Sequence, residues 1–241
     1  MRATRGLLAA GVSVFAVLWI GGVANYMIRG APPPGLGWTA PVFLIVGALV
    51  CVAAVESRQA VTLTMAGLLG WGTEAIGVRT GIPFGSYAYT DALGPGALGV
   101  PFAMVPAWLM LVAYVVHLWR CVNIHPWLRL GCSALWLVLA DLVLDPVAAG
   151  PLGFWRWTNS GPYYGVPLVN FAGWSVVGIC TVLIAGRPER SSPWVLGIGA
   201  ATIAFFAVLA VSLGMVVPAL LGAALCAGHA MMMQQQRRCS T

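Results

Sequence analysis

Long apolar runs, separated by short segments that hold most of the arginines, dominate the pattern of hydrophobic and polar positions along this chain of 241 residues. A run of about 17 to 22 apolar residues is long enough to cross the hydrocarbon core of a bilayer as a helix. We therefore predict membrane spans near residues 6–26, 40–56, 60–78, 101–120, 127–148, 167–186, 193–211 and 214–232. The last two runs are separated only around Ser212 to Gly214, so seven spans are the alternative to eight.

The predicted fold class is all-α: a polytopic transmembrane helix bundle that forms a single membrane domain over residues 1–241. The composition agrees, because a chain that is 60% hydrophobic and 7% charged cannot bury its apolar side chains in one soluble core. The first apolar run follows Arg2 and Arg5 as in a signal peptide. Because many more spans follow it, we interpret it as an uncleaved first helix.

The twelve basic residues are all arginines, and they mostly flank the apolar runs. In a soluble protein the net charge of +6 would suggest nucleic acid as a partner, but here it is a topology signal and we expect none. If the N-terminus is cytoplasmic, only Arg29, Arg79 and Arg156 lie outside. This asymmetry predicts a multi-pass protein of the cell membrane with both termini in the cytoplasm.

A short motif occurs twice in the chain. Gly99-Val100-Pro101 is followed after seven residues by Trp108, and Gly165-Val166-Pro167 is followed at the same interval by Trp174. We infer a tandem repeat of two hairpins, 60–120 and 127–186, which form a motif-bearing core, with residues 1–56 and 193–232 as peripheral spans. The loops 79–100 and 149–166, both outside in this topology, are long and rich in Gly, Pro and aromatic residues.

Three carboxylic acids, Glu74, Asp141 and Asp145, lie inside these spans near their outer ends, and Asn170 lies at a similar depth. A charged side chain inside the bilayer is costly, at roughly 2.5 to 3.5 kcal/mol at the centre of a spanning helix, and such residues usually mark pathways or catalytic sites. The clustering at one depth favours a functional site. Asp141 and Asp145 are one helical turn apart, and burial and mutual repulsion disfavour a charge on both, so one is a candidate proton donor and the other a base.

A purely structural interpretation remains open for these acids. They would then pair with Arg79 and Arg156 and hold helices together. Aromatic residues at the same depth also have two interpretations, because Trp and Tyr form interfacial belts and their ring faces also stabilise cations within about 6 Å. They are Tyr87, Tyr89, Trp108, Trp155, Trp157, Tyr163, Tyr164 and Trp174.

Several kinds of chemistry have no motif in the sequence. The three histidines are too far apart for a di-iron site, and the six cysteines have no CxxC spacing, so we expect no metal. The chain has no GxGxxG after a strand, no GxSxG and no P-loop. We therefore expect no cofactor and no serine hydrolase or ATPase activity.

The segment from Glu74 to Tyr89, followed by Gly99-Val100-Pro101 and Trp108, resembles the integral-membrane carotenoid biosynthesis family. So does a second block that runs from Asp141 to Pro146, through Trp155-Arg156-Trp157, to Asn170 and Trp174. The resemblance covers residues 60–186. It implies a cofactor-independent hydratase, a hydro-lyase that adds water across the terminal C1=C2 double bond of an acyclic carotenoid end group.

Such a reaction requires protonation of C2 and capture of the resulting cation by water, and two carboxyl groups suffice for it. We predict Asp145 or Asp141 as the acid, Glu74 as the carboxylate that orients water, Asn170 as a hydrogen-bond partner and Arg79 and Arg156 as supporting residues. The predicted substrate-binding residues are Tyr87, Tyr89, Trp108, Trp155, Trp157, Tyr164, Asn170 and Trp174.

Two other functions remain open. A membrane terpene or carotenoid cyclase would use the same protonation but exclude water. A carotenoid-binding or transport protein would use the buried acids as a proton relay. In each case the expected partners are an acyclic carotenoid or related long isoprenoid, the lipid bilayer and, as further candidates, other enzymes of the carotenoid pathway.

Overall fold

The structure is a computed structural model that describes residues 2–30 and 33–239. Over these residues it contains eight α-helices, so the predicted all-α class is confirmed and the count is eight. Most of the predicted boundaries agree to within three residues, and Gly214, with φ of +68°, makes the turn between the last two helices. The helices are α1 (Arg2–Arg29), α2 (Thr39–Ala53), α3 (Ser57–Thr80), α4 (Met104–Leu118), α5 (Pro126–Ala149), α6 (Leu168–Ala185), α7 (Pro193–Ser212) and α8 (Val216–Cys239).

Six of these helices, all except α2 and α4, are long and apolar enough to cross a membrane. Large apolar side chains such as Ile20, Leu68 and Leu220 are exposed on the outer faces of the bundle. Exposed apolar side chains on several long helices are what lipid contact requires, so the chain is a multi-pass membrane protein.

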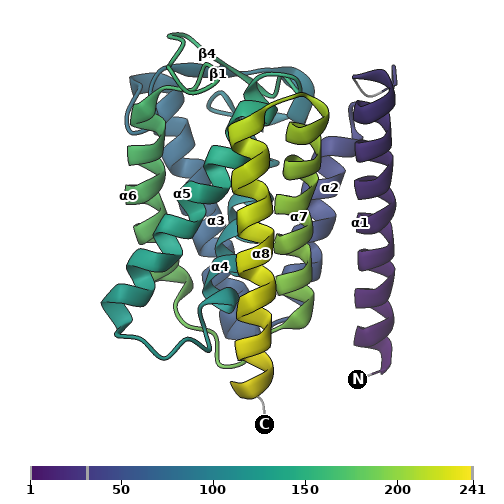
Figure 1. Ribbon diagram of the computed structural model, residues 1–241, viewed down its shortest axis with the longest axis vertical. Coiled ribbons are helices and arrows are strands. Elements are labelled where there is room, and N and C mark those ends of the chain that lie inside the picture. The colour runs from purple at the N-terminus through teal and green to yellow at the C-terminus, as the bar shows by residue number, and fades with distance from the viewer. Residues whose placement is uncertain (1, 31–32, 240–241) are drawn as a thin grey trace.

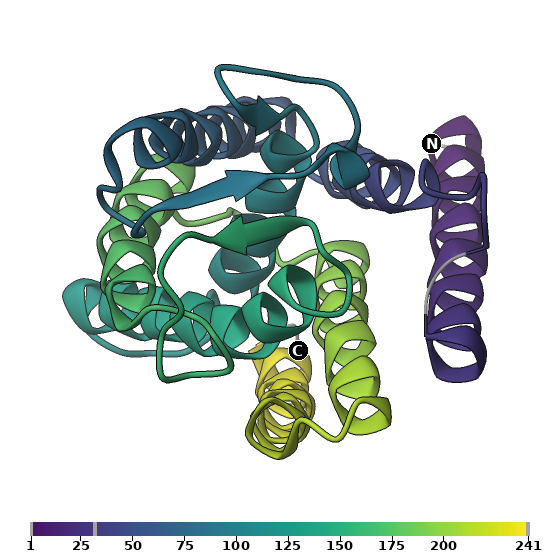
Figure 2. The ribbon, with the colours of Figure 1, turned by 90° about the horizontal axis from the view of Figure 1, so that it is seen from above.

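The helices run alongside one another, and the two chain termini lie at the same end of the bundle (Figure 1). Seen from above, α4 is surrounded by other helices, whereas α1 stands at the edge (Figure 2). Nearly all of α4 is buried, including Trp108 and every residue from there to Leu118. Helix α7 also packs against α2, α4, α5 and α8, so it contributes to the interior although its sequence lies outside the motif-bearing segment.

Short strands in the two long loops cover the end of the bundle opposite the termini (Figures 1 and 2). Strand β1 (Tyr87–Tyr89) pairs antiparallel with β4 (Trp155–Trp157), which we call the β1–β4 ribbon. Strand β2 (Gly96–Ala97) pairs with β3 (Val100–Pro101), and a 3₁₀ turn, η1 (Asp91–Leu93), lies between β1 and β2. The spans are therefore helical as expected, while the loops add strands that the sequence pattern did not indicate.

The two hairpins share a tight turn before the repeated motif. Leu98 and Gly99 have φ angles of 58° and 85°, and Tyr164 and Gly165 have nearly the same angles, 50° and 87°. Two successive residues with positive φ are typical of the turn that joins antiparallel strands. The same turn thus occurs at both copies of the motif, while the tandem repeat of hairpins stays a prediction. Helices α3 and α6 pack against each other.

Candidate active site

The three acids and Asn170 are buried just beneath the β1–β4 ribbon. Glu74 lies near the end of α3, Asp141 and Asp145 lie near the end of α5, and Asn170 lies in the first turn of α6. None of the four side chains is more than 5% exposed. The helices place them there because α3 and α5 run towards the ribbon while α6 starts below it.

Glu74 accepts hydrogen bonds from two aromatic side chains of its own hairpin. The Tyr87 hydroxyl donates to Oε2 of Glu74, and the Trp108 indole Nε1 donates to Oε1 over 3.3 Å. Burial and, after it, the charge of Glu74 raise the pKa of Tyr87 and of Tyr89. Both hydroxyls therefore keep their protons and act as donors.

Asp141 and Asp145 are joined through one amide group. Nδ2 of Asn170 donates to Oδ2 of Asp141 and to Oδ2 of Asp145, each over 2.7 Å. Asp145 also accepts from Nε1 of Trp155 in the ribbon, over 2.9 Å. Two carboxyl groups on one amide in apolar surroundings repel each other when both are charged, so a state with a single proton on the pair is favoured.

The tryptophans that follow the repeated motif stack on each other. The ring centroids of Trp108 and Trp174 are 4.2 Å apart, with an angle of 19° between the planes. The tryptophans of the two copies of the motif therefore meet at the centre of the site, and a two-fold relation between the hairpins stays a prediction.

The β1–β4 ribbon covers this centre with aromatic rings. Because side chains alternate along a strand, Tyr87 and Tyr89 lie on one face together with Trp157 and Trp155 of the paired strand. The ring centroids are 5.1 Å apart for Tyr87 and Trp157 and 5.8 Å apart for Tyr89 and Trp155. Arg156 lies on the other face of the ribbon.

An apolar cavity of about 80 Å³ lies beside the stacked tryptophans. Of the three intramembrane acids, Asp141 is the one that lines it, and Trp108, Trp155 and Trp174 contribute to its wall. One carboxyl group, that of Asp141, thus lines an apolar space together with aromatic rings, and a second carboxyl group, that of Asp145, lies next to it. Such a space suits protonation of a hydrocarbon and stabilisation of the cation that results.

The chain has matches among known proteins. Residues 39–229 match the family described as carotenoid biosynthesis protein. The chain belongs to this family. It is also 38% identical over 135 residues to bisanhydrobacterioruberin hydratase of Haloarcula japonica, an alignment that covers 54% of this chain and 45% of that protein. The chain thus matches less than half of the relative's length, and no solved structure matches it.

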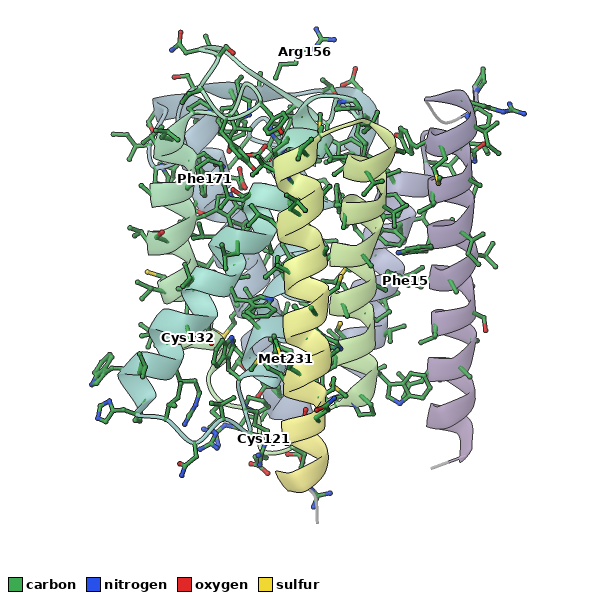
Figure 3. All side chains as sticks on the ribbon, viewed as in Figure 1. Phe15, Cys121, Cys132, Arg156, Phe171 and Met231 are labelled. Carbon is green, nitrogen blue, oxygen red and sulfur yellow. The ribbon has the colours of Figure 1, made fainter. Side chains whose placement is uncertain are left out.

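Three of the predicted site residues of this carotenoid biosynthesis protein lie away from the acids. Arg79 and Arg156 are exposed, Arg156 points away from the bundle (Figure 3), and within the described residues neither forms an ion pair. The hydroxyl of Tyr164 accepts a hydrogen bond from the main-chain nitrogen of Val217, over 3.3 Å. Tyrosine and tryptophan donors and Asn170, rather than arginines, therefore satisfy the acids.

Other residues of the cavity wall could not be singled out from the sequence. Leu44 of α2 and Thr202 and Phe206 of α7 line the cavity, although both helices lie outside the segment that carries the motifs. Their sequence context is that of ordinary apolar spans, so nothing local distinguishes them. In the part of the chain that the structure describes, no three His, Cys, Asp or Glu side chains form a group that could hold a metal, and cofactor independence stays a prediction.

Proposed function

We propose that this carotenoid biosynthesis protein hydrates the terminal C1=C2 double bond of an acyclic carotenoid end group. The observation that carries the proposal is the Asp141 carboxyl in the wall of an apolar cavity, joined through Asn170 to a second carboxyl. Membership of the family and similarity to a protein named as a hydratase support it.

The reaction begins when Asp141 transfers its proton to C2 of the end group, which leaves a tertiary cation at C1. Trp108 and Trp174 line the cavity, and their rings stabilise this charge. A water molecule then forms the new C–O bond at C1, and its proton goes to the Asp141–Asp145 pair, which has just lost one. The sum is the addition of one water molecule, and no electrons are exchanged with a cofactor.

The other polar residues act by position. Asn170 holds the two carboxyl groups together, and Trp155 holds Asp145 from above. Glu74 does not line this cavity, and its carboxylate oxygens already accept hydrogen bonds from Tyr87 and Trp108. We therefore assign Glu74 the role of positioning Trp108 rather than that of orienting water.

Expression in a host that makes lycopene tests the proposal. The wild-type protein should convert the pigment to a product heavier by the mass of one water molecule, and Asp141→Asn should abolish this product. Asp91→Asn is the matched control, because it makes the same change at an exposed acid in η1. Immunoblots of the membrane fraction establish that both variants accumulate equally.

Each alternative gives a different outcome. A new product of unchanged mass would indicate cyclisation instead of hydration, and unchanged lycopene bound to the purified protein would indicate a carrier. Hydrated product at the wild-type level from Asp141→Asn would refute the assignment of Asp141 as the acid.

A further inference from the structure

A second and larger cavity lies between α1 and the rest of the bundle. It has a volume of about 510 Å³ and is bounded by the second half of α1, the start of α2, the loop after α5 and the middle of α7. We call it the α1 cleft. It is near the same end of the bundle as the ribbon, because α1 runs towards that end (Figure 1).

The α1 cleft adjoins the cavity that Asp141 lines. Three residues, Leu44 of α2, Phe154 of the loop after α5 and Phe206 of α7, belong to the walls of both. All three side chains are apolar. A molecule in the cleft therefore contacts residues that also line the cavity of the acid.

The lining of the α1 cleft is suited to hydrocarbon. It contains no charged side chain, and its aromatic and aliphatic members include Leu18, Phe43, Leu152 and Phe205. Asn25 also lines it, but its amide is used within α1, where Nδ2 donates to the carbonyl of Gly21 over 2.8 Å. Thr39 likewise donates to the nearby carbonyl of Leu36 over 2.7 Å. A charged headgroup or a peptide backbone would find few partners here.

Helix α1 is held as a fixed wall of the cleft. Phe15 stacks on Phe43 of α2, with ring centroids 4.3 Å apart, and lies on the side of α1 that faces the bundle (Figure 3). The Trp19 indole donates to the carbonyl of Ala201 in α7 over 2.7 Å. These contacts fix α1 beside α2 and α7. The cleft begins at Val17 and continues along α1 towards the C-terminal end of the helix.

We propose that the α1 cleft holds the polyene chain of the substrate, while the end group passes between Leu44, Phe154 and Phe206 to reach Asp141. This inference rests on the proposed function and adds to it a binding site for the long unreactive part of the molecule. Van der Waals packing of the polyene against these apolar walls supplies affinity that is independent of the reacting end.

Two glycines of the cleft wall have room for a larger residue. A Cβ atom at Gly21 of α1 or at Gly37, which precedes α2, would meet no atom within 4 Å, and both residues line the cleft. Gly21→Leu and Gly37→Leu therefore place a side chain in the space proposed for the polyene. Gly6→Leu is the matched control, since Gly6 is on α1, is equally free of neighbours and lies away from the cleft.

The test compares a long and a short substrate that carry the same isopropylidene end group, lycopene and a ten-carbon acyclic terpene. We expect Gly21→Leu and Gly37→Leu to lower kcat/KM for lycopene roughly tenfold, which corresponds to about 1.4 kcal/mol of lost packing between the polyene and the cleft. Turnover of the short substrate should be unchanged, and Gly6→Leu should match the wild type with both substrates. Lycopene retained by the purified Asp141→Asn protein should fall to the same extent when either cleft substitution is added.

Wild-type kcat/KM for lycopene in both cleft variants would overturn the inference while leaving the proposed function intact. Equal loss with the long and the short substrate would also overturn it, because the damage would then lie at the acid. If the wild type hydrated neither substrate, the proposed function would fail, and lycopene retention by the wild type and the cleft variants would still decide whether the cleft binds the polyene.

Discussion

Replacement of Gly70 by alanine tests how the central tryptophans are held. Gly70 is buried in α3, and a Cβ atom there would lie 2.2 Å from Cγ of Trp108. The Trp108 ring is large and its neighbours are fixed, so it must leave its stack on Trp174 and its hydrogen bond to Glu74. Gly72, two residues along the same helix, has no atom within 4 Å of such a Cβ. Gly72→Ala is therefore the matched control.

The two substitutions are expected to change the free energy of unfolding in opposite directions. Overpacking costs about 1–3 kcal/mol and the lost stacking about 0.5–1.5 kcal/mol, whereas alanine in place of glycine gains up to about 1 kcal/mol in a helix. Gly70→Ala should lower the free energy of unfolding by about 0.5–4.5 kcal/mol, while Gly72→Ala should leave it unchanged or raise it by up to about 1 kcal/mol.

Thermal unfolding in detergent, followed by tryptophan fluorescence, measures both changes. The yield of hydrated carotenoid measures the consequence for the reaction, and we expect it to fall only in Gly70→Ala. If Gly70→Ala were as stable and as active as Gly72→Ala, the close packing of α3 on Trp108 and its link to the reaction would both be refuted.

Two further predictions concern the carboxyl pair and the loop after β4. Asn170→Leu removes both hydrogen bonds from the pair, so it should destabilise the protein by about 1–3 kcal/mol and lower activity. Ser175→Ala in the same helix loses one local hydrogen bond and should change stability by less than about 0.5 kcal/mol. Equal unfolding temperatures of the two variants would contradict this prediction. Burial, followed by Tyr164 and Asp141, raises the pKa of Tyr163 to about 12. The folded state then binds this proton more tightly than the unfolded state, so stability should fall as the pH rises from about 10 to about 12, and Tyr163→Phe should flatten that fall in pH-dependent unfolding curves.

The membrane spans could be predicted because each depends on a local property, the length of an apolar run. The β1–β4 ribbon could not, since each strand has only three residues and its partner lies in the other hairpin. Pairing of such short strands is decided by the packing of the bundle beneath them. The tight turns at the repeated motif could be predicted in part. Gly99 and Gly165 indicate a turn, but its geometry also depends on the positive φ angles of Leu98 and Tyr164.

The acids of the site could be predicted for an energetic reason, since a carboxyl group inside a span is costly and therefore conspicuous. Their partners were harder to predict. The depth of Asn170 predicts it as a partner of the acids, whereas charge alone predicts the exposed arginines as partners. Phe206 and Leu44 could not be identified, because an apolar residue that lines a cavity has the same sequence context as one that faces lipid.

The hydrogen bonds of the buried acids have a consequence for how the chain inserts and folds. Glu74 is bonded to Tyr87 and Trp108 of the first hairpin, and Asp145 is bonded to Trp155 and Asn170 of the second. Each hairpin can therefore leave the insertion machinery with its own acids already satisfied. The packing of α3 on α6, the tryptophan stack and the ribbon await the meeting of the two halves, but the hydrogen bonds that satisfy the acids do not.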